Sequence, residues 1–324
     1  MHKVFLSNGV YFECASDQTI LDAAKNNDLA IEYSCKNGRC GACVSGVLKG
    51  VSTTIVAEEF LQTSVSADSV ILTCCRAPLS DIWLDIEDLG AIGLLRSLTL
   101  PCRIDSLEHL VGNVCRLHLR LPPNSNFRYV PGQYIDLIKG DIRRSYSIAN
   151  APREDGVLEL HLKRVEDGSM SDYVFNEAKI NDLLRFEGPM GTFSYRQDQS
   201  RNIVLMATGT GIAPIKALLE SFKGCKPDKK IYVVWGDRYK QDLYLELGSE
   251  GIDYQFVPVL SRQDTKGYFF GYVQDAVVDL ELNLEETTVY ACGSADMIDS
   301  ASKLFFQRGL HRKNFHSDAF VSSN

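Results

Sequence analysis

Long hydrophobic runs are missing from this sequence of 324 residues. No stretch approaches the roughly 18 continuous apolar residues that a membrane-spanning helix requires, which argues against a membrane partner. The first residues, MHKVFLSNGVYFECASD, also lack the apolar block of a secretory signal peptide. We therefore expect a cytoplasmic protein.

An excess of positive charge is missing as well. The chain has 34 Lys and Arg against 42 Asp and Glu, a net charge of −8, which argues against nucleic-acid binding. Residues 1–90 hold 12 acidic and 6 basic side chains, so they carry −6 of that charge. This acidic excess is either a solvated surface or a docking face for a partner protein, and Glu58 and Glu59 are consecutive acids for the second interpretation.

Internal repeats and low-complexity linkers are absent too, yet the chain is longer than one hydrophobic core usually organises. Changes in pattern predict three domains, at residues 1–90, 97–198 and 199–324. The first combines a hairpin around SNG, a helix in TILDAAKNNDL capped by Asp17 or Thr19, and strands in SVILTCCRAP and DIWLDI. This order predicts a small α+β domain.

The middle segment contains five β-rich runs broken by Pro, Gly and Asn, which predict an antiparallel barrel. They are LPCRIDSLEHL, VCRLHLRLPP, GQYIDLI, RRSYSIA and VLELHLKRV. The last segment alternates apolar strands with helical patterns, beginning at RNIVLMATGTGIAPIKALLESF and continuing through KIYVVWG, YQFVPVL and TVYACGS. Such alternation predicts a parallel α/β sheet.

Cysteine is what the sequence has in abundance, with ten residues of which several cluster. In YSCKNGRCGACVSG, Cys35, Cys40 and Cys43 have the spacing C-x4-C-x2-C, and Cys74 follows in ILTCC. This is the ligand pattern of a plant-type 2Fe-2S cluster. A zinc site is the alternative, but zinc sites favour paired C-x2-C knuckles and only one such pair exists here.

Glycines in the cysteine loop support a cluster. Gly38 and Gly41 allow the backbone to approach closely and to turn N–H groups toward the sulfur atoms. Cys75 is adjacent to Cys74, and a regular strand would point it to the opposite face, so Cys74 is the expected ligand.

Residues 1–90 resemble a plant-type ferredoxin, which implies a β-grasp fold. The rest resembles the ferredoxin-NADP reductase superfamily through RRSYS, GSMS, GPMGTF, TGTGIAP and YACGS, in that family's order. The domain order is similar to that of one-chain reductases that feed oxygenases. IEYSCKNGRCGAC, RRSYSIANAP and HSDAFVSS further resemble the reductases that serve a PMP-dependent dehydrase of CDP-sugars.

Two motifs predict a flavin site. In RRSYS, Arg144 can bind a flavin phosphate, Tyr146 can stack on the isoalloxazine, and Ser147 can hydrogen-bond near its N5. Gly168, Ser169 and Ser171 begin a predicted helix whose free N–H groups can bind a pyrophosphate, with Lys163 as a counter-charge. A second phosphate site favours FAD over FMN. Alone, RRSYS is typical of an ordinary strand.

The third segment carries a predicted nucleotide site at the carboxyl ends of its strands. Its residues are Thr208, Gly209, Thr210, Gly211, Pro214, Cys292 and Gly293. The resemblance places Cys292 against the nicotinamide, with Asp318 as the acid and Phe320 covering the flavin. Without it, Cys292 could be a buried strand cysteine and Phe320 a core plug.

Together these motifs predict an oxidoreductase in which NADH reduces FAD and the electrons reach a 2Fe-2S cluster singly, then a partner protein. The resemblance implies as partner the PMP-dependent dehydrase of 3,6-dideoxyhexose synthesis for a bacterial surface polysaccharide. An oxygenase component is the alternative partner, and a non-enzymatic redox sensor is a third interpretation. Ser261 and Arg262 follow a strand and can hold a 2′-phosphate, so NADPH is the alternative donor.

Overall fold

The structure is a computed structural model that describes residues 1–62, 69–90, 95–225, 228–248 and 251–320. Contacts divide the chain into two compact units, Met1–Arg96 with Gly191–Phe193, and Ser97–Met190 with Ser194–Asn324. The second unit holds both the barrel and the parallel sheet. The boundary that the sequence suggests near residue 198 therefore stays a prediction.

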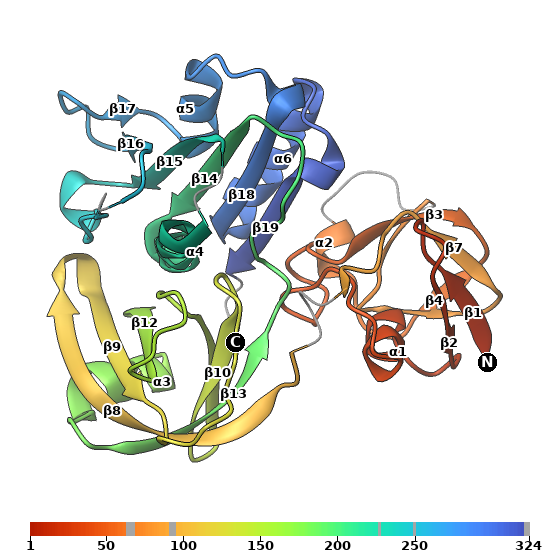
Figure 1. Ribbon diagram of the computed structural model, residues 1–324, viewed down its shortest axis with the longest axis horizontal. Coiled ribbons are helices and arrows are strands. Elements are labelled where there is room, and N and C mark those ends of the chain that lie inside the picture. The colour runs from red at the N-terminus through yellow and green to blue at the C-terminus, as the bar shows by residue number, and fades with distance from the viewer. Residues whose placement is uncertain (63–68, 91–94, 226–227, 249–250, 321–324) are drawn as a thin grey trace. The chain divides into compact units, whose positions relative to one another are not determined.

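The first unit is a mixed β-sheet with two helices packed against its core (Figure 1). Its five-stranded sheet has the order β2-β1-β7-β3-β5, and β4 pairs with β6 in a separate ribbon. Among the strand pairs in the described part of this unit, β1 and β7 are parallel and the others are antiparallel. The elements are β1 (His2–Phe5), β2 (Tyr11–Cys14), α1 (Ile20–Asn26), β3 (Val44–Lys49), β4 (Ser52–Thr54), α2 (Glu59–Gln62), β5 (Val70–Leu72), β6 (Arg76–Pro78) and β7 (Ile82–Leu84).

Local sequence signals explain how this unit begins. β1 and β2 form the hairpin predicted around SNG. The Thr19 hydroxyl accepts a hydrogen bond from the Asp22 backbone N–H at 3.0 Å, so Thr19 is the N-cap of α1. The predicted strand at SVILTCCRAP is interrupted, because a turn at residues 73–75 separates β5 from β6.

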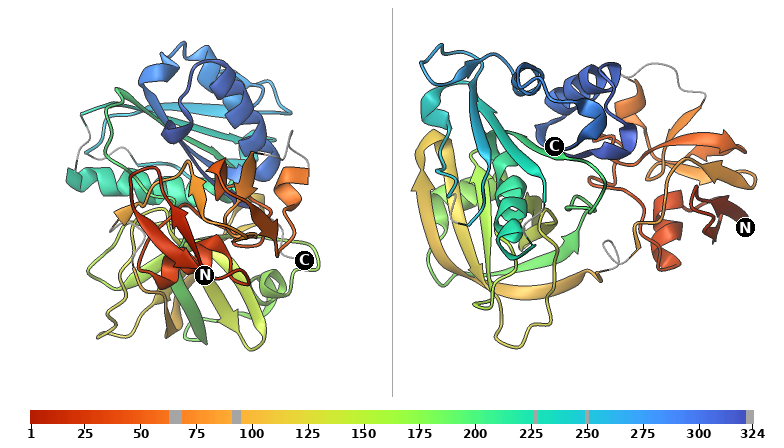
Figure 2. Two further views of the ribbon diagram at one scale, coloured as in Figure 1. Left: turned by 90° about the vertical axis from the view of Figure 1, so that its right-hand side faces the viewer. Right: turned by 45° about the horizontal axis from the view of Figure 1, so that its top comes forward.

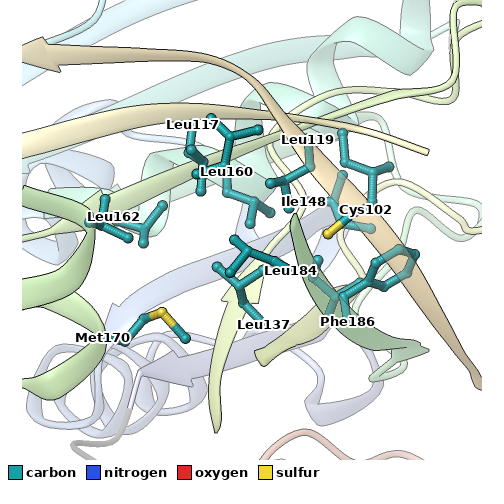
Figure 3. Close-up of a cluster of buried hydrophobic side chains, with 14 of the residues drawn as sticks. Cys102, Leu117, Leu119, Leu137, Ile148, Leu160, Leu162, Met170, Leu184 and Phe186 are labelled. Carbon is teal, nitrogen blue, oxygen red and sulfur yellow. The ribbon is translucent and has the colours of Figure 1, made fainter. Parts of the chain in front are cut away.

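The barrel of the second unit is an antiparallel sheet of six strands in the order β11-β10-β13-β8-β9-β12. A bridge between Ile148 and Leu160 joins its two edges. Leucines and Phe186 fill the interior (Figure 3). The elements are β8 (Leu98–Leu110), η2 (Val111–Asn113), β9 (Val114–Arg120), β10 (Tyr134–Lys139), β11 (Ile142–Ser147), β12 (Val157–Lys163), α3 (Ser169–Asp172), η3 (Tyr173–Glu177) and β13 (Leu183–Met190). β13 was not predicted from the sequence.

The remainder of this unit is a six-stranded parallel sheet with the order β17-β16-β15-β14-β18-β19. The elements are β14 (Asn202–Thr208), η4 (Gly209–Gly211), α4 (Ile212–Cys225), β15 (Lys230–Asp237), η5 (Lys240–Asp242), β16 (Gln255–Leu260), β17 (Phe269–Phe270), α5 (Val273–Asp279), η6 (Leu284–Glu286), β18 (Thr287–Ser294), α6 (Ala295–Gln307), η7 (Arg312–Asn314) and β19 (Phe315–Phe320). β17 and β19 were not predicted.

Right-handed crossovers determine which face each helix covers. The order reverses at β14, so α4 lies on one face while α5 and α6 pack together on the other. α4 lies between the parallel sheet and the barrel (Figures 1 and 2). Among the described residues, no helix is long and apolar enough to cross a membrane.

Candidate functional site

The four predicted ligand cysteines form two close pairs. Cys43 ends the loop before β3, and its Sγ lies 3.2 Å from that of Cys74 in the turn after β5. The thiols of Cys35 and Cys40 hydrogen-bond to each other, and the Cys35 N–H donates to the Cys40 Sγ at 3.4 Å. Two segments that are distant in sequence, the loop at 35–43 and the turn at 73–75, thus hold the four cysteines as two pairs.

Backbone N–H groups of the loop point at these sulfur atoms. The Cys35 sulfur accepts from Asn37, Arg39 and Cys40, and the Cys74 sulfur accepts from Gly38. Such donors stabilise the negative charge of a metal-bound thiolate. The loop therefore supplies the backbone hydrogen bonds to sulfur that an iron–sulfur cluster needs.

Gly38 and Gly41 make this loop possible. Both have positive φ, +79° and +75°. A Cβ at Gly38 would lie 2.1 Å from the Ala57 carbonyl oxygen, and one at Gly41 would lie 2.5 Å from the Phe60 ring. The prediction that both glycines adopt conformations a side chain would forbid is confirmed.

The paired arrangement fits a two-iron cluster, because each iron of a 2Fe-2S cluster takes two protein ligands. A structural zinc site instead needs four ligands around one ion. Within the described part of the chain, no group of three or more His, Cys, Asp or Glu side chains surrounds a single metal position.

The sequence predicted that Cys75 would point to the face opposite Cys74. The structure shows that it does not. Because residues 73–75 form a turn, the alternation of a strand does not apply, and the Cys75 Sγ lies 3.5 Å from that of Cys74. The Cys75 thiol also donates to the Ala57 carbonyl at 3.6 Å. Cys75 is fully buried beside the expected ligand.

Glu58 is a structural residue and not part of an exposed docking face. It is buried, its carboxylate lies 2.7 Å from the Arg76 guanidinium, and it accepts the Leu72 N–H at 2.8 Å. Glu59 is exposed and pairs with Arg39 of the cysteine loop at 2.9 Å. Reversing the charge of Glu58 would therefore disrupt the fold around Cys74. Of these two glutamates, only Glu59 can test the effect of surface charge on docking.

The flavin motif RRSYS forms β11, an edge strand of the barrel sheet. Strand alternation places Ile142, Arg144 and Tyr146 on one face, and Ile142 and Tyr146 pack against the barrel core. Burial raises the pKa of Tyr146 to about 12, so its phenol stays protonated. Ser147 ends the strand, buried opposite Tyr134.

The helix predicted at GSMS is confirmed but short. α3 begins after Gly168 and packs against β11, and Ser169 and Ser171 lie in it. The Ser171 hydroxyl accepts the Val165 N–H at 2.9 Å, so it closes the preceding turn. Its hydroxyl thus has a structural role that sequence alone did not indicate.

A cleft of about 820 Å³ opens beside the start of α3. Gly168, Ser169 and Ile142 line it, together with two cations that sequence reasoning missed, Lys139 and Arg164. The Lys139 ammonium lies 3.3 Å from the centre of the Tyr173 ring. The only sequence signal for these cations was their position next to β11 and GSMS.

Lys163 has a different place from the one expected. Its ammonium group lies 3.9 Å from the Asp237 carboxylate, at the end of β15 in the parallel sheet. A Cβ built on Gly209 would lie 3.9 Å from the Lys163 Nζ. The structure thus places Lys163 beside Gly209 of the predicted nucleotide site. The sequence had predicted it as the counter-charge for a pyrophosphate at the GSMS segment.

The predicted nucleotide residues meet at one edge of the parallel sheet. β14 ends at Thr208, a 3₁₀ turn covers Gly209, Thr210 and Gly211, and Pro214 lies in the first turn of α4. A Cβ at Gly211 would lie 2.2 Å from the Cys292 carbonyl oxygen. The two glycine motifs are therefore adjacent, as predicted, where the strand order reverses.

The ends of β18 and β19 complete this edge. Gly293 has φ +149° and a Cβ there would lie 2.1 Å from the Thr208 Oγ1. Cys292 pairs with Asp318, and burial followed by the negative charge of Asp318 raises the pKa of Cys292 well above its usual value. The Cys292 thiol is therefore protonated. Phe320 lies at the end of β19 with 36% of its surface exposed.

Known families match all three parts of the chain. The 2Fe-2S iron-sulfur cluster binding domain matches residues 4–79, the oxidoreductase FAD-binding domain residues 101–195, and the oxidoreductase NAD-binding domain residues 205–303. The fold and these matches define an iron–sulfur flavoprotein reductase with the three-part architecture predicted from the sequence. Its cofactors are a 2Fe-2S cluster, FAD and a nicotinamide nucleotide.

Similar proteins narrow the family. The chain is 40% identical to the CDP-6-deoxy-L-threo-D-glycero-4-hexulose-3-dehydrase reductase of Yersinia pestis, over 98% of this chain and 97% of that protein. It is 31% identical to a terephthalate 1,2-dioxygenase reductase component of Comamonas, over 99% and 98%. The structure of the Amycolatopsis cytochrome P450 reductase GcoB is similar with a TM-score of 0.73, 27% identity and 99% coverage of both chains. The chain belongs to the ferredoxin-reductase-like family that includes the dehydrase reductases.

Membership in this family decides between the two classes of protein that the sequence left open, an electron-transfer reductase and a non-enzymatic redox sensor. The relatives are reductases or electron-transfer components, so the chain is an NAD(P)H-dependent oxidoreductase that supplies electrons to a partner protein. A non-enzymatic redox sensor is not supported.

Proposed function

We propose that this chain delivers electrons from NADH to a PMP-dependent dehydrase that acts on CDP-6-deoxy-L-threo-D-glycero-4-hexulose. The observation that carries this proposal is the 40% identity to a reductase named for that dehydrase, against 31% for the terephthalate dioxygenase reductase, over nearly the whole chain in both comparisons. NADH, FAD and a 2Fe-2S cluster together convert a two-electron donor into single-electron transfers.

Each segment of the chain has a part in this proposal. Cys35, Cys40, Cys43 and Cys74 hold the cluster, supported by the N–H groups directed at their sulfur atoms. Arg144, Tyr146, Ser147 and the residues Gly168, Ser169 and Ser171 bind FAD next to the cleft on the barrel. Thr208–Gly211, Pro214 and Gly293 bind the nucleotide. The nicotinamide and flavin rings lie among four side chains. These are the protonated Cys292 thiol and the side chains of Asp318, Ser147 and Phe320.

Coupled turnover tests the partner. We expect the purified chain, given NADH, the dehydrase and its CDP-hexulose, to oxidise NADH in proportion to deoxygenated sugar. The matched reaction replaces the dehydrase with a terephthalate dioxygenase oxygenase component and its aromatic substrate. Faster coupled turnover with the oxygenase would assign the chain to ring hydroxylation, the second candidate that its similarity to oxygenase reductases supports.

The identity of the flavin is a separate prediction. We expect mass analysis of the cofactor released from the denatured protein to find FAD, because the oxidoreductase FAD-binding domain matches residues 101–195 and the GSMS segment offers backbone N–H groups beyond Arg144. Recovery of FMN alone would mean that the GSMS segment only begins a helix.

Docking is expected to depend on salt. The acidic first 90 residues carry −6, so electron transfer to the dehydrase should slow as ionic strength approaches 0.15 M, where the Debye length is about 8 Å. Stopped-flow measurements at low salt should show roughly threefold slower partner reduction in Glu59→Lys, because the cluster loop gains positive charge. Glu285→Lys makes the same charge change on an exposed residue outside residues 1–90 and is the control. A rate that does not change with ionic strength would leave the acidic excess as a solvated surface.

A further inference from the structure

A buried polar cluster lies where β12 of the barrel faces α4 and the loop after η5. We call Glu159, His161, Lys216 and Tyr244 the Glu159 cluster. Glu159 accepts hydrogen bonds from His161 Nε2 at 2.8 Å and from Lys216 Nζ at 3.0 Å. His161 Nδ1 lies 2.9 Å from the Tyr244 hydroxyl. None of these side chains belongs to the cofactor sites described above.

β12 is buried on both faces, which explains how the cluster is held. Leu158, Leu160 and Leu162 point into the barrel core (Figure 3 labels the last two), so Glu159 and His161 point outward to the parallel sheet and α4. Two more side chains approach the Glu159 carboxylate, the Arg116 guanidinium at 3.8 Å and the His118 imidazole at 3.7 Å.

The charges of the cluster follow from this environment. Burial by itself would raise the pKa of Glu159, but hydrogen bonds from His118 and His161 and the charge of Lys216 lower that pKa well below its usual range. Burial lowers the pKa of His161, so its imidazole is neutral. A neutral ring can donate from Nε2 to Glu159 and accept at Nδ1 from Tyr244.

The cluster ends at two segments that the reaction uses. Lys216 Nζ donates to the Ala149 carbonyl at 3.0 Å, two residues beyond Ser147 of the flavin strand. At the other end, the Tyr244 ring packs edge-on against Trp235 with centroids 5.4 Å apart. The Trp235 indole N–H donates to the Gly209 carbonyl at 3.0 Å. A continuous path of contacts therefore joins the flavin strand to the nucleotide loop.

Apolar side chains would fill this interface with a smaller unfavourable free energy, because burying charged groups carries a large desolvation penalty. Hydrogen bonds have directions, however, and they fix the distance and angle between two surfaces more tightly than apolar packing does. The geometry therefore favours a role in alignment over a role in stability alone.

We propose that Glu159, His161 and Lys216 are positioning residues that set the placement of the Gly209 loop relative to Ala149, and thereby of the nicotinamide relative to the flavin. This inference rests on the proposed oxidation of NADH by the flavin. A displacement of about 1 Å between reacting groups costs about 100-fold in rate, so partial loss of alignment should slow the reaction strongly.

The test is Lys216→Gln, which removes the ammonium group that joins Glu159 to Ala149. We expect the rate constant of flavin reduction at saturating NADH to fall about tenfold, while the Kd for NAD⁺ changes by less than about threefold. Stopped flow measures the first, and equilibrium titration of the flavin absorbance with NAD⁺ measures the second. We also expect the difference spectrum induced by NAD⁺ to change shape. Lys303→Gln, which breaks an exposed pair with Asp299, is the matched control.

A milder variant covers the case in which Lys216→Gln fails to fold or loses FAD. Tyr244→Phe removes only the hydroxyl that meets His161 and keeps both ring contacts. We expect about a threefold slower reduction in Tyr244→Phe with an unchanged Kd. Reduction at the wild-type rate in the folded variant, with only a lower Tm, would overturn the inference. Failure of NADH to reduce the wild type and Lys303→Gln would instead refute the proposed function.

Discussion

Cys74→Ser is expected to remove the 2Fe-2S cluster and to lower electron transfer to a one-electron protein such as cytochrome c by on the order of 100-fold. The Cys74 sulfur pairs with that of Cys43 at 3.2 Å and receives the Gly38 N–H, so no other group can replace both contacts without a change in the turn. Reduction of a simple dye by NADH should persist, because it needs only the flavin. Absorbance and EPR spectra measure the cluster.

Cys75→Ser is the matched control for this prediction, and it should keep the cluster. Because Cys75 lies only 3.5 Å from the Cys74 sulfur, the double variant Cys74→Ser/Cys75→Ser is also needed. A cluster that survives in Cys74→Ser and disappears in the double variant would show that Cys75 can replace the ligand. A cluster that survives in both would refute the assignment of Cys74.

Gly211→Ala should abolish most reduction by NADH while FAD and the cluster remain bound. The new Cβ would lie 2.2 Å from the Cys292 carbonyl oxygen and 2.6 Å from its carbon, so the η4 turn must move away from β18 at the nucleotide edge. We expect flavin reduction to slow by on the order of 100-fold in stopped flow.

Gly248→Ala is the control for Gly211→Ala, because a Cβ at Gly248 meets nothing within 4 Å. The FAD content and the cluster spectrum report whether the rest of Gly211→Ala is intact. A rate of NADH reduction equal to that of Gly248→Ala would mean that the glycine motif does not contribute to the nucleotide site.

Local patterns predicted the parts of the fold that depend on local chemistry. The hairpin around SNG, the cap at Thr19 and the strand–turn–helix at Gly209 follow from turn residues, a hydroxyl before a helix and glycine flexibility. Strands with charged or polar residues between their apolar residues were harder to predict, both inside a sheet, as for β13 between β10 and β8, and at a sheet edge, as for β19. β13 and β19 carry Arg, Glu, His and Asp between their apolar residues, so their alternation is weak, and tertiary pairing decides their conformation.

The cluster ligands could be predicted because their spacing is itself the signal, whereas the environment of nearby groups could not. Glu58 is typical of a surface acid in sequence, and only the structure shows its burial against Arg76. Lys163 was assigned by proximity along the chain, but strand alternation directs it away to Asp237. β12 has Glu159 and His161 on a face that the sequence gives no reason to consider buried.

The close contacts among cysteine sulfurs affect how the protein must be handled. With Cys43 and Cys74 3.2 Å apart, thiols that have lost iron are poised for oxidation by dissolved oxygen to a disulfide, with two electrons passing to the oxidant. Such a bond would occupy the sulfur atoms that iron needs. Reconstitution with iron and sulfide should therefore begin with a thiol reductant under anaerobic conditions.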